Sequence, residues 1–116
     1  MKQLLLIFLL ISSTVMAQKN DPEEVIRRVA DNVIRNTSFQ FVNSATGEKF
    51  ASTKGRDTSF NVKAESRYNK WAYVNGVLTV GMIEMSKVLN DSKYSDYSKR
   101  NFDFIFSNLD YFFGKG

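Results

Sequence analysis

The sequence contains no cysteine and no histidine, and these two absences exclude several classes of site. Without these residues the chain cannot form a zinc finger, a disulfide framework, a thiol nucleophile or a Ser-His-Asp triad. A metal site would have to use oxygen ligands alone, which are the donors that calcium and magnesium prefer. We therefore expect no metal site and no other cofactor.

Charge of one sign is also scarce. The 116 residues include 16 basic and 12 acidic side chains, a net charge of +4, and the basic residues form no run. A nucleic-acid arm or a polybasic membrane patch would concentrate them, so we expect neither nucleic acid nor a membrane surface as a partner. An apolar content of 43% and a charged content of 24% are typical of a globular domain and argue against wholesale disorder.

The first 17 residues have the three parts of a secretory signal peptide. Lys2 precedes the apolar run Leu4–Ile11, and Val15 and Ala17 stand three and one positions before a cleavage site. The run is far shorter than the ~20 residues that span a bilayer, and no cysteine is present to carry a lipid. We predict a signal peptide over 1–17 and a folded region over 18–116. The protein would be bacterial, exported to the periplasm or secreted, with no stable membrane anchor after cleavage.

The folded region opens with a helix start. Asp21 can cap the free amides, and Pro22 suits the first helical position. Apolar residues then recur in pairs every four positions and end near Asn36: Val25, Ile26, Val29, Ala30, Val33 and Ile34. This single stripe predicts an amphipathic helix on the outside of the fold.

Residues 37–70 sustain no helical period. Phe39, Phe41 and Val42 favour a short strand, and residues 43–47 and 53–58 are rich in turn formers. A structureless connection of this length is unusual inside a compact domain. We interpret it as a loop that rims a binding cleft; the alternative is that it holds regular elements which its pattern does not reveal.

A helical hairpin is predicted for the rest of the chain. Its first helix runs from about 72–75 to Leu89, with apolar residues around its whole circumference, so we expect burial on all sides. After a turn at 90–92, a second helix is predicted over Lys93–Phe112. Its apolar face would consist of Tyr94, Tyr97, Phe102, Ile105, Leu109 and Phe112. Its solvent-facing side would carry Lys99, Arg100, Asp103 and Asn108.

Two one-sided helices cannot cover a helix that is apolar all round. We therefore expect this chain to be the N-terminal piece of a larger protein. The alternative is a complete, small, exported helical protein, a binding or adaptor module that dimerises through the uncovered face.

The densest cluster of candidate binding residues is 68–76, at the entry to the apolar helix. Trp71 and Tyr73 can stack on sugar rings, and Asn75 can donate hydrogen bonds to hydroxyls or carboxylates. At a helix N-terminus such a cleft would favour an anionic ligand. The alternative is that Trp71 and Tyr73 only fasten the preceding loop to the core.

A glycosidase needs two carboxylates with separate roles. Glu65 lies just before the aromatic cluster, whereas Asp103 and Asp110 would share one face of the last helix, on the solvent side. The candidate carboxylates are Asp57, Glu65, Glu84, Asp103 and Asp110. No two of them have the spacing expected of a catalytic acid and its partner carboxylate.

Two short motifs occupy the predicted hairpin: Trp71-Ala72-Tyr73-Val74-Asn75-Gly76-Val77-Leu78-Thr79-Val80-Gly81, and Asn90-Asp91-Ser92-Lys93-Tyr94 with Tyr97 after it. They resemble the first helical hairpin of the six-hairpin glycosidases, within these the unsaturated rhamnogalacturonyl hydrolases of glycoside hydrolase families 105 and 88. The helix over 23–37 and the segment 63–68 are similar as well. The resemblance implies an all-α fold, an (α/α)6 barrel of twelve helices, to which 18–116 would contribute about three.

The resemblance also implies a reaction and a partner. The substrate would be a pectin oligosaccharide with a 4,5-unsaturated galacturonate at its non-reducing end. In this family a carboxylic acid protonates the double bond, water adds at C5, and the hemiketal collapses. The catalytic aspartates and histidine of the family lie on later hairpins, so this chain would line the cleft with Trp71, Tyr73 and Asn75 and supply no catalytic residue. A lyase or epimerase built on another (α/α) barrel is the alternative enzyme.

Overall fold

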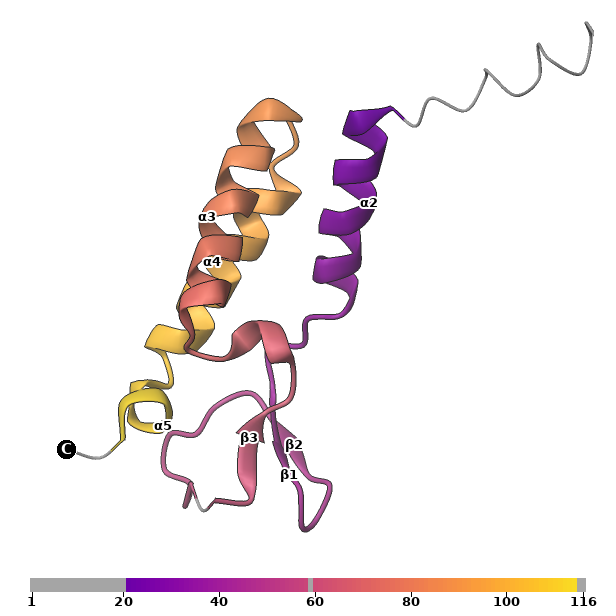
Figure 1. The fold of residues 1–116 in the computed structure, drawn as a ribbon. Coiled ribbons are helices and arrows are strands. Elements are labelled where there is room, and N and C mark those ends of the chain that lie inside the picture. The colour runs from indigo at the N-terminus through magenta and orange to yellow at the C-terminus, as the bar shows by residue number, and fades with distance from the viewer. Residues whose placement is uncertain (1–20, 59, 115–116) are drawn as a thin grey trace, which may run out of the picture.

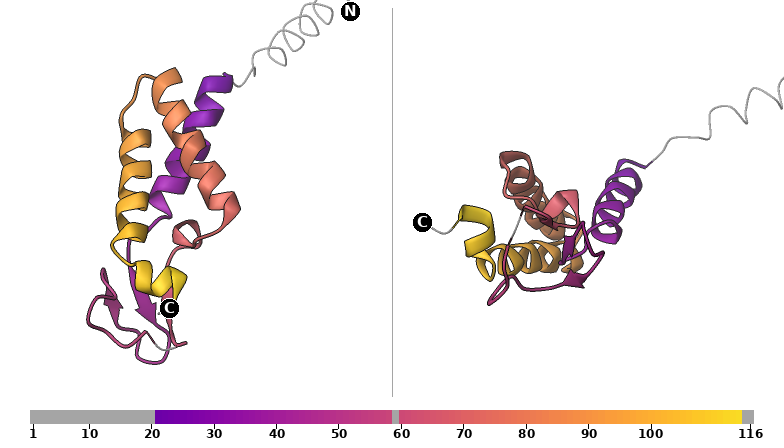
Figure 2. Two further views of the ribbon diagram at one scale, coloured as in Figure 1. Left: turned by 90° about the vertical axis from the view of Figure 1, so that its left-hand side faces the viewer. Right: turned by 90° about the horizontal axis from the view of Figure 1, so that it is seen from below.

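The computed structural model describes residues 21–58 and 60–114. The predicted signal peptide over 1–17 lies outside these residues. In chain order the elements are α2 (Pro22–Arg35), β1 (Phe41–Asn43), β2 (Lys49–Phe50), β3 (Val62–Ala64), the 3-10 helix η2 (Arg67–Asn69), α3 (Tyr73–Val88), α4 (Lys93–Phe106) and α5 (Leu109–Phe113). The three long helices lie side by side at one end and the strands at the other (Figures 1 and 2). Across the described ranges, no helix combines the length and the apolarity needed to cross a membrane.

Helix α2 confirms the predicted first helix. The Asp21 carboxylate accepts a hydrogen bond from the Glu23 amide (3.0 Å), and Pro22 occupies the first turn. Ala30 and Val33 are buried against α3 and α4, whereas Val29 near the middle of the stripe is 62% exposed. The buried residues of the stripe therefore lie in its C-terminal half.

The interpretation of residues 37–70 as a structureless loop is wrong. The segment forms a three-stranded antiparallel sheet in the order β2-β1-β3, in which Phe41 pairs with Phe50 on one side and Ala64 on the other. Strands of two or three residues are too short to display a period-two pattern, which explains why the sequence did not reveal them. The fold is therefore mainly helical, with a small sheet that the all-α prediction omitted.

The hairpin of α3 and α4 is confirmed, but the predicted helix over Lys93–Phe112 is interrupted. Helix α4 ends at Phe106, and α5 starts at Leu109. The Asn108 side chain was expected in solvent but is buried: its Oδ1 accepts from the Thr53 amide (2.8 Å) and hydroxyl (3.0 Å), and its Nδ2 donates to the Phe104 carbonyl (2.7 Å). An asparagine that bonds to the backbone in this way competes with the helical ladder.

The buried face of α4 also differs from the predicted one. Phe104 is buried in place of Phe102, which is half-buried, and Leu109 is 43% exposed. The observed face follows a repeat of three and four residues: Tyr94, Tyr97, Ser98, Asn101, Phe104 and Ile105. Two of its members are polar, and this is the reason that apolar spacing alone misplaced the stripe.

Burial of α3 on all sides is not observed. Among the described residues of this helix, only Thr79 and Met82 are buried. Four valines are between 54% and 81% exposed: Val74, Val77, Val80 and Val88. Met82 packs with residues of α2 and α4, whereas the side of α3 that carries the valines is exposed.

Two buried clusters hold the fold together. The first joins the three long helices through Ala30, Val33, Met82, Leu89, Tyr94 and Tyr97. The second joins the sheet to α4 through Phe41, Val62, Ala64, Phe104 and Ile105. Phe39 packs against both clusters and connects them.

We predict that Phe41→Ala destabilises the protein by about 3–5 kcal/mol, the cost of a large cavity in an aromatic core. Phe41 is fully buried, and its ring centroid lies 4.9 Å from that of Phe104 and 4.7 Å from that of Tyr111. Urea unfolding followed by circular dichroism measures the change. Phe60→Ala is the control, because Phe60 is 97% exposed. A loss at position 41 no larger than at position 60 would contradict the prediction.

Candidate functional site

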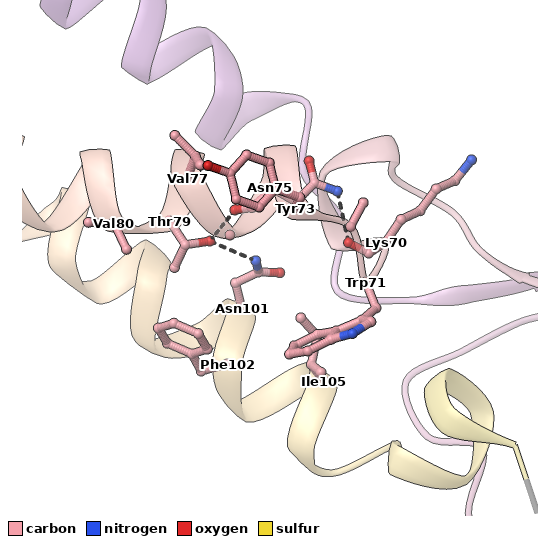
Figure 3. A pocket seen from close by; sticks show the side chains of 12 residues that line it. Lys70, Trp71, Tyr73, Asn75, Val77, Thr79, Val80, Asn101, Phe102 and Ile105 are labelled. Carbon is pink, nitrogen blue, oxygen red and sulfur yellow. Dashed lines mark hydrogen bonds between the residues drawn. The ribbon is translucent and has the colours of Figure 1, made fainter.

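A groove of about 570 Å³ lies between the N-terminal half of α3 and the C-terminal half of α4 (Figure 3). Most of the surface around it is apolar. The lining residues are Lys70, Trp71, Ala72, Tyr73, Asn75, Gly76, Val77, Thr79, Val80, Asn101, Phe102 and Ile105. All three predicted binding residues, Trp71, Tyr73 and Asn75, are among them. An apolar groove with a few convergent polar groups is typical of a small-molecule site.

The two aromatic residues differ in how firmly they are held. The Trp71 indole meets the Phe113 ring of α5 edge-on, with centroids 5.0 Å apart and an interplanar angle of 61°, yet Trp71 is 54% exposed. Tyr73 is 87% exposed and fastens nothing to the core. Trp71 is therefore oriented by one packed edge while much of its surface is free to meet a ligand.

Asn75 organises the entry to the groove. Its Nδ2 donates to the backbone carbonyls of Arg67 and Lys70, both at 2.9 Å. These two bonds use both amide hydrogens and tie η2 to the first turn of α3. Only the side-chain oxygen of Asn75 is left for a ligand. The sequence predicted that Asn75 donates hydrogen bonds to a ligand, but in the structure it donates them to the backbone.

The N-terminus of α3 is open at the mouth of the groove. Ala72 is the N-cap residue, in an extended conformation (φ −149°, ψ 148°), and no described side chain caps the helix. The first amides of a helix have no partner within the helix, and the aligned peptide dipoles make this end positive. Such a terminus is suited to an anionic group.

A buried polar chain at the floor of the groove was missed by the sequence analysis. Asn69 Nδ2 donates to Asn101 Oδ1 (3.0 Å), and Asn101 Nδ2 donates to Thr79 Oγ1 (3.3 Å). The three residues are at most 2% exposed and come from η2, α4 and α3. The signal was present in the sequence, because Asn101 lies seven positions after Tyr94 on the buried face of its helix.

None of the candidate carboxylates lines the groove. Glu84 pairs with Lys87 and Asp103 with Lys99, both at 2.7 Å on the surface. Asp57 and Asp110 border a separate cavity of about 440 Å³. The prediction that Asp103 and Asp110 share one helix face is wrong, because the break at Asn108 lies between them.

Glu65 is also unsuited to act as an acid. It forms an ion pair with Lys49 and accepts a hydrogen bond from the Ser38 hydroxyl (2.7 Å). Lys49 first and Ser38 second hold the pKa of the Glu65 carboxyl below its ordinary range, so the group is ionised at neutral pH. A general acid needs the opposite shift.

The described residues thus bring aromatic and polar side chains to the groove but no carboxylic acid. Within 21–58 and 60–114, no three acidic side chains converge as a metal site would require. No family model, curated protein or solved structure matches the chain significantly. The geometry of the groove is thus the main guide to function.

We predict that the Glu65 interactions stabilise the protein in a pH-dependent way. Because the folded pKa is lowered, the stabilisation is complete above the unfolded pKa of about 4.3 and is lost as pH falls through the folded value. The free energies of unfolding of the wild type and Glu65→Gln should differ at pH 7 and converge only when the pH has fallen below the folded pKa of Glu65. Chemical denaturation across this range measures the difference.

Glu84→Gln is the matched control, since the Glu84–Lys87 pair lies on the exposed surface of α3. A difference between wild type and Glu65→Gln that stays constant with pH would contradict the assignment to the charge of Glu65.

Proposed function

We propose that the groove binds the acidic, non-reducing end of an oligosaccharide. We further propose that the chain belongs to an exported glycoside hydrolase that removes 4,5-unsaturated galacturonate from rhamnogalacturonan fragments. The observation that carries the proposal is the uncapped N-terminus of α3 at Ala72, flanked by the exposed rings of Trp71 and Tyr73. An aromatic face and a positive helix end together match a sugar ring that bears a carboxylate.

Support for a barrel comes from the outward face of α3. Its four exposed valines are spaced to share one side of the helix, and its buried residues Thr79 and Met82 lie on the other. Figure 2 shows α3 beside α4. A contiguous apolar face of this kind marks an interaction surface. In an (α/α)6 barrel the inner helices cover one another, and α3 would be an inner helix with α2 and α4 outside it.

The reaction needs an acid that the groove does not contain. Protonation of the double bond at C4 and addition of water at C5 give a hemiketal, which opens and releases the next sugar; one water molecule is consumed. In the proposal this chain binds and orients the uronate, and residues outside those described here supply the proton. Trp71 would hold the ring, and the α3 amides would hold the carboxylate.

The same apolar side of α3 favours a second candidate, a helical adaptor that docks a partner helix or a second copy there. A discrete dimer in sedimentation, with no affinity for uronates, would favour the adaptor over the hydrolase.

We predict that the unsaturated galacturonosyl-rhamnose disaccharide changes the fluorescence of Trp71 saturably. Trp71 is the only tryptophan in the sequence, so its emission reports directly on the groove. A neutral galactosyl-rhamnose disaccharide should bind about fivefold more weakly, since it lacks the carboxylate–dipole interaction of ~1 kcal/mol.

The same mixture, followed by the absorbance of the unsaturated uronate, should show no turnover by this chain alone. Equal affinity for the two disaccharides would contradict the anionic site. Turnover would contradict the placement of the acid outside the described residues.

We predict that Ala72→Asp stabilises the protein and weakens uronate binding. An aspartate at an extended N-cap position gains about 1 kcal/mol by capping. The same carboxylate would repel the ligand carboxylate, with about fivefold lower affinity for charges ~4 Å apart in water. Thermal unfolding and Trp71 fluorescence measure the two effects.

Ala72→Ser is the matched variant, because it caps the helix without adding charge. It should gain stability and lose less affinity than Ala72→Asp. Two variants with equal affinities for the uronate would show that no anion lies at this terminus.

A further inference from the structure

We propose that the side-chain amide of Asn101 determines specificity in the groove by bonding a ring hydroxyl of the bound sugar. The inference rests on the proposed carbohydrate-binding function and extends it to a residue that the sequence analysis did not identify. Asn101 is 2% exposed, lines the groove, and lies between Thr79 and Trp71 in Figure 3. It is thus placed to meet a sugar that stacks on the indole.

The orientation of the Asn101 amide follows from its neighbours. The Thr79 hydroxyl donates its only hydrogen to the backbone carbonyl of Asn75 (2.8 Å), so its oxygen must accept from Asn101. The Asn101 Nδ2 therefore faces Thr79, and Oδ1 faces Asn69 Nδ2 (3.0 Å). The hydrogen bonds therefore distinguish the nitrogen from the oxygen of the Asn101 amide.

This arrangement leaves the side-chain oxygen of Asn69, Oδ1, buried with no hydrogen-bond partner among the described residues. Since Asn101 Oδ1 can only accept, Asn69 must present its amino group and turn its own oxygen away. Burying an unpaired carbonyl is unfavourable, and an apolar residue at position 101 would leave the Asn69 amino group unpaired as well. Asn69 does not line the groove, so its part in the network is to hold the Asn101 amide, which does.

The Asn101 amide, which lines the groove, has bonding capacity that the described residues do not use. An asparagine side chain has two donor hydrogens and two acceptor positions, and the described residues use one of each on Asn101. One donor and one acceptor on a neutral group match a hydroxyl, which can both accept and donate. A site built to bond a hydroxyl rejects the analogue that lacks it, because the amide is then left unpaired.

The test compares hydroxyl discrimination in wild type and variants. The probes are methyl galactosiduronate and neutral methyl galactoside, each with its 2-deoxy and 3-deoxy analogues, titrated against Trp71 fluorescence of the full chain. In the wild type, one deoxy analogue of each series should bind about five- to tenfold more weakly than its parent, the effect of one hydrogen bond.

In Asn101→Leu, which keeps a similar volume, the ratio of the two dissociation constants should fall to about one. A purely structural role for Asn101 would weaken all probes by one common factor and leave the ratio unchanged; that result overturns the inference.

Thr79 supplies a second, milder test in case Asn101→Leu does not fold. Thr79→Val removes the hydroxyl that orients Asn101 at nearly constant shape, and Thr79→Ser retains it. Reduced discrimination in Thr79→Val with wild-type discrimination in Thr79→Ser supports the positioning of Asn101. Equal discrimination in the two variants overturns it.

The two series of probes separate this inference from the proposed function. Neutral galactosides that bind with an Asn101-dependent ratio, while the uronates gain no affinity, support the inference and overturn the anionic site. If the uronates bind more tightly than the galactosides, and Asn101→Leu leaves the ratio of deoxy analogue to parent unchanged, the anionic site is supported and the inference is overturned. Failure of every sugar to bind overturns both.

Discussion

The packing of rings around Phe41 is the constraint on which the rest of the structure depends. Strands of two or three residues are too short to be stable alone. The central strand β1 places Phe41 against Phe50 of β2, Phe104 of α4 and Tyr111 of α5. The sheet is thus held by the helices, and through β3 it sets where η2 and the start of α3 lie. Ile105 belongs to this cluster and also lines the groove, although Phe41 does not.

The sequence predicted the elements that are long enough to show several repeats of their apolar pattern. The cap at Asp21 and the stripe through Ala30 and Val33 located α2, and the spacing of Tyr94 and Tyr97 located α4. The strands were missed because their pairing is made across residues that are distant in sequence, as for Phe41 and Ala64. The break after Phe106 was missed because Asn108 bonds to Thr53, a contact that no local pattern contains.

The candidate site was predicted in part. Aromatic and amide residues in 68–76 pointed to the end of α3 where the groove lies, since their composition is typical of sugar contacts. The function of each was less predictable. Asn75 is committed to two backbone carbonyls, and Asn101 reaches the groove from another helix. Ala72 is equally informative: a poor capping residue at this position costs stability and leaves the amides of α3 accessible.

The bond between Asn108 and Thr53 also bears on how the chain assembles. It joins residues 55 positions apart, whereas the bond between Asn101 and Thr79 spans 22. Loop-closure entropy scales as (3/2)RT ln n, so the longer closure costs roughly 0.8 kcal/mol more. Chain entropy therefore ranks the closure between Asn101 and Thr79 ahead of the closure that joins Asn108 to Thr53, but by only about fourfold. The hydrogen bond between Asn101 and Thr79 at the floor of the groove therefore closes a shorter loop than the bond that fixes the break between α4 and α5.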